Sequence, residues 1–103
     1  MLNLWGGQVV SLHEELEAAK QAQTVISTLS TSALNWNVVA VLRSAMSVAT
    51  NAITTFPSEE PLNEARHAVG IALANLIRGP LTQEKIDNAK GAIGVWMVEL
   101  LQR

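Results

Sequence analysis

Cysteine is absent from this chain of 103 residues. Disulfide bonds, thiol nucleophiles and thiolate metal sites are therefore excluded, and a reducing, cytoplasmic setting suits the composition. Tyrosine is also absent and phenylalanine occurs once, so the aromatic residues that favour strands are few. Apolar residues instead recur with helical spacing in four segments. We predict an all-α fold, a small bundle of about four helices.

Charge is scarce as well. Charged residues make up 16% of the chain, against roughly 25% in ordinary globular domains. The seven basic residues are scattered singly, from Lys20 to Arg103, and the formal net charge is −2. No basic patch therefore favours nucleic-acid binding. Because apolar residues reach 49%, the domain has more apolar surface than usual to bury, and we expect a homo-oligomer.

The sequence also lacks a recognisable targeting segment. Residues 1–10 have neither the basic start nor the long apolar run of a secretory signal, and we interpret them as an apolar arm before a single domain over residues 11–103. The most apolar long segment, residues 33–56, contains Arg43 near its middle, which costs about 2.5 to 3.5 kcal/mol in a bilayer. We expect a buried helix of a soluble protein and no membrane partner.

The first predicted helix begins after Ser11, whose hydroxyl can cap the backbone while Glu14 completes a capping box. The Ser- and Thr-rich residues 27–32 favour a break, because their side chains compete for backbone hydrogen bonds. A single helix continuing through this segment stays open as an alternative. The predicted core positions of this helix are Leu12, Leu16, Ala19, Ala22, Ile26 and Leu29.

The second predicted helix runs from about Ala33 to Thr55 and ends at Phe56-Pro57, because proline cannot donate a backbone N–H and disfavours helix in the residue before it. Ser58 is the predicted N-cap of the third helix. The predicted core positions of the second helix are Val38, Leu42, Ala45, Ala49, Ala52 and Phe56, widened by Leu34, Val41 and Val48.

The third predicted helix ends at Gly79, a left-handed C-terminal glycine followed by Pro80. Thr82 is the predicted N-cap of a fourth helix that continues to the C-terminus. The predicted core positions of the third helix are Leu62, Ala65, Val69, Ala72, Leu73 and Leu76, and those of the fourth are Ile86, Ala89, Ile93, Trp96, Met97 and Leu100.

Two groups of residues could carry chemistry. Glu64 and His67 have the Glu-x-x-His spacing of carboxylate di-iron bundles, but helical geometry turns both roughly 130° or more from the core stripe, so we expect a solvated pair. His13 stands beside Glu14, Glu15 and Glu17, and acidic residues in a first helical turn are explained by the helix dipole. We therefore predict no catalytic residue, no metal site and no cofactor.

Three surfaces remain as candidate interfaces. Trp36 projects roughly 160° from the core stripe of its helix, with Arg43 two turns later. A large aromatic residue in this position is either a contact anchor or covered by the apolar residues of the arm. Outside the core stripes lie Ile71 and Ala74 on the third helix, and Gly91, Val95 and Val98 on the fourth.

These patterns predict a non-enzymatic protein–protein interaction module that associates with itself, and with another protein as a further option. By analogy of size alone, accessory proteins of phages and mobile elements fit this description, including inhibitors that occupy a partner's surface. The alternative is a small-molecule-binding bundle, with an apolar pocket lined by Trp36, Trp96, Met46 and Met97.

Overall fold

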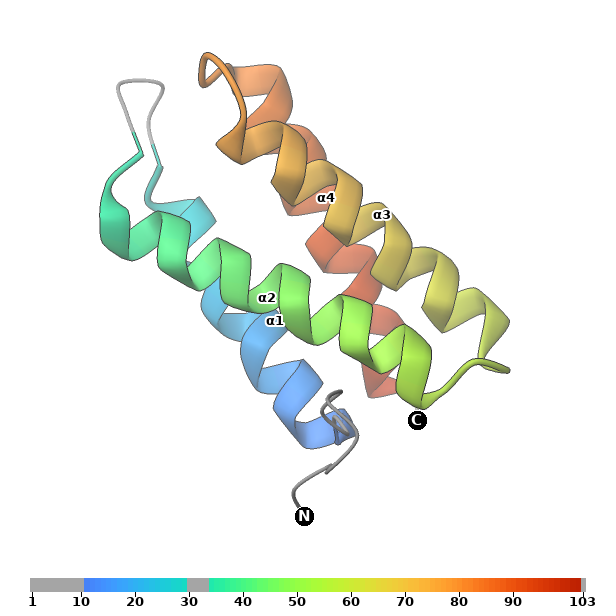
Figure 1. The fold of residues 1–103 in the computed structure, drawn as a ribbon. Helices are drawn as coiled ribbons and strands as arrows, with labels where there is room; N and C mark the ends of the chain where they lie inside the picture. The colour runs from blue at the N-terminus through green and yellow to red at the C-terminus, as the bar shows by residue number, and fades with distance from the viewer. Residues whose placement is uncertain (1–10, 30–33, 103) are drawn as a thin grey trace.

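The computed structural model describes residues 11–29 and 34–102, which contain four helices and no strand (Figure 1). The predicted all-α fold is confirmed. The predicted arm, residues 1–10, lies outside the described residues. The helices are α1 (Leu12–Ser27), α2 (Trp36–Thr55), α3 (Glu60–Ile77) and α4 (Gln83–Leu101).

The four helices form a ring in which each packs against two others. α2 packs against α1 and α3, and α4 packs against the same two helices, so α1 and α3 face each other diagonally across the bundle. Short connections make consecutive helices run in opposite directions. The N-terminal half of α1 therefore lies level with the C-terminal half of α4, an arrangement that can be followed by colour in Figure 1.

Hydrogen bonds at the helix starts confirm two predicted caps. The Ser11 hydroxyl accepts from the Glu14 backbone N–H at 3.1 Å and donates to the Glu14 carboxylate at 3.2 Å. The Thr82 hydroxyl accepts from the Lys85 backbone N–H at 3.2 Å. Each such cap satisfies one of the N–H groups that a helix start leaves without a partner.

The predicted cap of α3 is wrong. The N-cap is Glu59, and its side chain makes no capping hydrogen bond. The cap moves one residue along because the chain first turns at Phe56, whose carbonyl oxygen accepts from the Glu59 backbone N–H at 3.3 Å. That turn uses Ser58 as one of its inner positions, so α3 can begin only after it.

The break between the first two helices is confirmed, and the alternative of one continuous helix is wrong. α1 ends at Ser27, and α2 begins at Trp36, three residues later than predicted. The side chain of Asn35 determines this start by accepting from the Val38 backbone N–H at 2.9 Å. Asparagine is among the strongest N-cap residues, so α2 starts directly after it.

Gly79 ends α3 as predicted, with a backbone φ of +73°. A residue with a Cβ is strained in this left-handed conformation. The Lys85 ammonium holds the same turn by donating to the carbonyl oxygens of Arg78 and Pro80, each at 2.9 Å.

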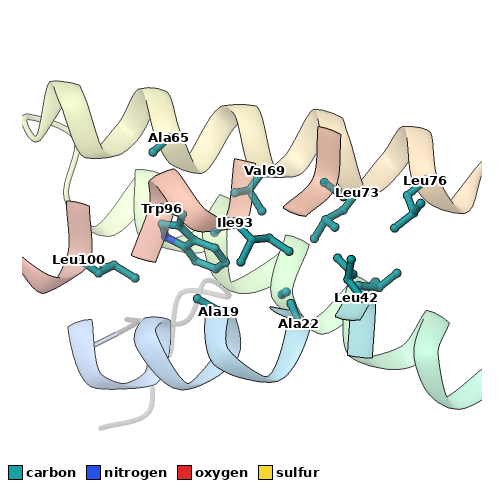
Figure 2. Close-up of a cluster of buried hydrophobic side chains, with 14 of the residues drawn as sticks. Ala19, Ala22, Leu42, Ala65, Val69, Leu73, Leu76, Ile93, Trp96 and Leu100 are labelled. Atoms are coloured by element: carbon teal, nitrogen blue, oxygen red, sulfur yellow. The ribbon is translucent and has the colours of Figure 1, made fainter. Parts of the chain in front are cut away.

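The core fills the space between the four helices, and Figure 2 shows its side chains pointing inward from α1, α2, α3 and α4. Most predicted core positions are buried. Those that are only half-buried are Leu12, Leu16, Leu29, Leu34, Val41, Val48, Phe56, Ala72 and Met97. Two charged residues that were not predicted are fully buried instead, Glu15 and Arg66.

One helix among the described residues, α2, is long and apolar enough to cross a membrane by length and composition alone. Five of its residues lie in the core, namely Val38, Leu42, Ala45, Ala49 and Ala52. Its outward face includes Arg43, Ser47 and Thr50, which are exposed and polar.

Candidate interaction surfaces and a buried polar cluster

Three side chains from three helices meet inside the bundle. Arg66 of α3 donates from Nε to Oε2 of Glu15 and from Nη2 to Oε1 of the same carboxylate, both at 2.7 Å. The indole Nε1 of Trp96, on α4, donates to Oε2 of Glu15 at 2.7 Å. The side chains of Glu15 and Arg66 are both fully buried. This bidentate geometry is the strongest form of an arginine–carboxylate pair.

The remaining guanidinium nitrogen of Arg66 faces the end of α2 and the start of α3. Nη1 donates to the side-chain oxygen of Asn63 at 2.7 Å and lies 3.3 Å from a carboxylate oxygen of Glu59. The Asn63 amide in turn donates to the carbonyl oxygen of Phe56 at 2.8 Å. The guanidinium carbon also lies 5.3 Å from the centre of the Phe56 ring, within the range of a cation–π contact.

These contacts show what the polar cluster can and cannot do. Glu15 and Trp96 form these hydrogen bonds within the cluster, whereas Arg66 also uses Nη1 on Asn63. All three side chains have almost no exposed surface. In this arrangement their polar atoms are not exposed to solvent. We conclude that the cluster is structural, and that it links α1, α3 and α4 across the core.

The prediction for Glu15 therefore needs correction. We interpreted Glu15 as a first-turn acid explained by the helix dipole, whereas its side chain is buried and paired. The signal that could have found it is its register, because Glu15 lies four, seven and eleven residues before the buried Ala19, Ala22 and Ile26. Arg66 falls within the α3 core stripe in the same way.

Outside the core, an open groove of about 570 Å³ runs between the end of α2 and the outer face of α3. Glu64 and His67 line it, which agrees with their predicted exposure. Among the described residues no group of three or more His, Asp and Glu side chains is placed to hold a metal ion. The full lining is Ile53, Pro57, Glu60, Asn63, Glu64, His67, Ala68 and Ile71.

Trp36 is the most exposed large apolar residue that the structure describes, at 84%. Arg43 is exposed on the same helix and makes no ion pair with any described residue. The alternative prediction, that the arm covers Trp36, concerns residues outside the described part of the chain.

On α4, Val95 and Val98 are 56% and 54% exposed, and Gly91 is exposed between the charged residues of the helix start and the two valines. A Cβ atom added at Gly91 or Gly94 would meet nothing within 4 Å. Packing against the described residues therefore requires neither glycine.

The two candidate residues on α3 lie apart from this α4 surface. Ile71 is 53% exposed and lines the α2–α3 groove, and Ala74 is half-buried. The structure therefore presents Gly91, Val95 and Val98 as one surface, and it places Ile71 on another.

The four residues of the predicted small-molecule pocket do not come together. Trp96 is fully buried with its N–H on Glu15, whereas Trp36 is exposed. Met46 and Met97 are half-buried and pack against the core. None of the four lines the groove between α2 and α3.

No protein-family model, curated protein or solved structure matches this chain.

Proposed function

We propose that this protein works by non-enzymatic protein–protein contact and associates with itself through the outer face of α4. The observation that supports the proposal is the surface formed by Gly91, Gly94, Val95 and Val98, which we call the α4 face. Its two valines are more than half exposed, and its two glycines have open space where a side chain would be.

The glycines matter because each weakens a helix interior by about 1 kcal/mol relative to alanine. Nothing within the described part of the chain uses the space that they leave. A second helix lying against the α4 face would use it, since glycine lets two helix backbones approach closely. A second copy of the chain presents an identical face, as a two-fold dimer requires.

The experiment is light scattering coupled to size exclusion, at low micromolar concentration. We expect a mass above the 11.1 kDa of one chain. Val95→Glu places an unpaired carboxylate in the contact, where its desolvation costs several kcal/mol, and we expect this variant to be monomeric. Because Val95 is exposed in the single chain, the variant keeps its helical circular dichroism and melts cooperatively.

The matched control is Gln21→Glu, which adds the same charge at an exposed position of α1. This variant keeps the mass of the unmodified protein. A monomeric unmodified protein would overturn the proposal. If Val95→Glu leaves the oligomer intact, the protein does not associate through the α4 face.

A further inference from the structure

We propose that two copies of the chain pair with their α4 helices antiparallel, so that each glycine of the α4 face lies opposite a large apolar side chain of the other copy. The inference rests on the proposed function, because it assigns a direction and a register to the same contact. It also brings a further residue, Leu101, into the contact. Leu101 is the last residue of α4 and is 67% exposed.

One side of α4 changes from small to large residues along its length. At intervals of three, four and three positions, this side carries Gly91, Gly94, Val98 and Leu101. Such intervals keep residues turned toward the same neighbouring helix. All four are at least partly exposed. The side is therefore narrow near the two glycines and wide near the two apolar side chains that follow them.

This asymmetry makes the side complementary to itself when the second helix runs in the opposite direction. With a two-fold axis level with Trp96, Gly94 lies opposite Val98 of the second copy, and Gly91 lies opposite Leu101. A small residue then faces a large one at every level, so the side chains interdigitate. The glycines also let the two backbones approach closely. The paired segment is about 15 Å long, from the rise of 1.5 Å per residue.

A parallel pair brings identical residues together instead. Two levels then contain only glycine and two contain pairs of large side chains, so no single distance between the helices fills both. Asp87 lies four positions before Gly91, is exposed, and makes no ion pair with a described residue. Its carboxylate accepts from the Gln83 side-chain amide at 2.9 Å. In a parallel pair the two Asp87 carboxylates face each other, which opposes association.

The antiparallel pair avoids this repulsion. The position opposite Asp87 is four residues past Leu101, the end of the second helix, so the carboxylate lies outside the contact. Val95 stands at the flank of the paired segment, one position from the level of the axis. Because the two-fold axis relates each flank to itself, the Val95 side chains of the two copies lie beside each other. Val95→Glu therefore brings two carboxylates together as well as desolvating them.

Exchange of small and large residues tests the register. Gly94→Val places a valine opposite Val98 at both equivalent sites, and we expect dimerisation at least about tenfold weaker by sedimentation equilibrium. Helical circular dichroism stays unchanged, because a Cβ at Gly94 meets nothing within 4 Å in the single chain. The double variant Gly94→Val, Val98→Gly restores a small residue opposite a large one and regains most of the affinity.

The matched control is Gly70→Val on α3. A Cβ at Gly70 also meets nothing within 4 Å, but this glycine lies outside the α4 contact. We expect this variant to dimerise like the unmodified protein. In a parallel pair Gly94→Val fills a gap between two glycines, so it would not weaken dimerisation.

Cross-linking gives an independent measurement of direction. The chain has no cysteine, so Gly94→Cys and Val98→Cys each introduce a single thiol. When the two variants are mixed and oxidised, we expect covalent dimers that contain one chain of each kind, since facing residues lie within reach of a disulfide. A parallel pair would instead link identical variants. Intact mass spectrometry separates the products, because the two variants differ in mass.

The results distinguish the arrangement from the contact itself. If Val95→Glu is monomeric but Gly94→Val dimerises fully, or if the covalent dimers contain identical variants, the antiparallel arrangement is wrong and the α4 contact stands. If the unmodified protein is a monomer, or if Val95→Glu leaves the oligomer intact, the α4 contact is wrong. Should Gly94→Cys fold poorly, a mixture of Gly91→Cys and Leu101→Cys tests the same register, with the same two outcomes.

Discussion

The two ends of the bundle core are built differently. At one end Glu15, Arg66 and Trp96 form a hydrogen-bonded cluster among apolar neighbours. At the other end Leu42, Leu73 and Leu76 meet without any buried charged side chain among the described residues, and Figure 2 shows this end opposite Trp96 and Leu100. The same four helices are thus held together by directional hydrogen bonds at one end and by apolar burial at the other.

The difference lies in how each end responds to a change. Apolar contacts are not directional, so a leucine can be replaced by another apolar residue of similar volume with a loss below about 1.5 kcal/mol. A buried ion pair depends on both partners, because removal of one leaves the other charge without water or a partner. We therefore expect the apolar end to tolerate exchange of one apolar residue for another. We expect the polar end to tolerate replacement of the whole cluster but not the loss of a single member.

The largest expected effect comes from breaking the polar end. Glu15→Ala leaves Nε and Nη2 of the buried Arg66 guanidinium without their partner, with Asn63 and Glu59 remaining only at Nη1. We expect a loss of about 3 to 5 kcal/mol in the free energy of unfolding. Urea denaturation followed by circular dichroism measures it. The comparison at the apolar end is Leu73→Ala, for which a cavity costs about 2 to 5 kcal/mol. A loss below about 1 kcal/mol for Glu15→Ala would mean that the ion pair does not stabilise the fold.

A smaller effect is expected when the cluster loses one donor. Trp96→Phe keeps an aromatic ring but removes the N–H that Glu15 accepts, and hydrogen bonds to charged groups contribute about 1.5 to 3 kcal/mol. The control is Trp36→Phe, at an exposed position, which should leave the urea midpoint unchanged. Equal midpoints for the two variants would show that the Trp96 N–H contributes nothing.

The smallest effect is expected when the polar end is converted into a second apolar end. The triple variant Glu15→Leu, Arg66→Met, Trp96→Phe removes both charges and the buried donor together. Replacement of a whole buried ion pair by apolar residues is often neutral or stabilising, so we expect stability within about 1.5 kcal/mol of the unmodified protein. A loss equal to the sum of the single changes would contradict this, because coupled residues are not additive.

The sequence predicted those features that are local along the chain. Ser11 and Thr82 cap their helices through residues three positions away, and Gly79 ends α3 through its own backbone angle. Each of these depends on a few adjacent residues, so each could be identified from the sequence. The Ser58 prediction failed for a related reason, because the turn at Phe56 competes for the same residues.

The polar cluster and the groove were missed because they depend on residues far apart in the chain. The two charges of the buried pair are separated by 51 positions, and a glutamate in a first helical turn already has a sufficient local explanation. The groove exists only because α2 and α3 pack side by side, so that Ile53 of α2 and Glu64 of α3 both line it. Of the candidate surfaces, the exposure of Trp36, Val95 and Val98 could be predicted, since it follows from helical spacing alone.

The diagonal link between α1 and α3 has a consequence for the handedness of the bundle. Four helices with similar apolar stripes can close around a core in two mirror-related orders, and apolar burial distinguishes the two only weakly. The arrangement here is the one in which Trp96 and Arg66 approach the same carboxylate from neighbouring helices. In the opposite order, α4 would lie on the other side of Glu15, and the Trp96 N–H would have to approach the carboxylate from a different direction. We therefore expect this cluster to favour one handedness of the bundle over the other. Contacts between leucine and alanine side chains alone do not provide this specificity.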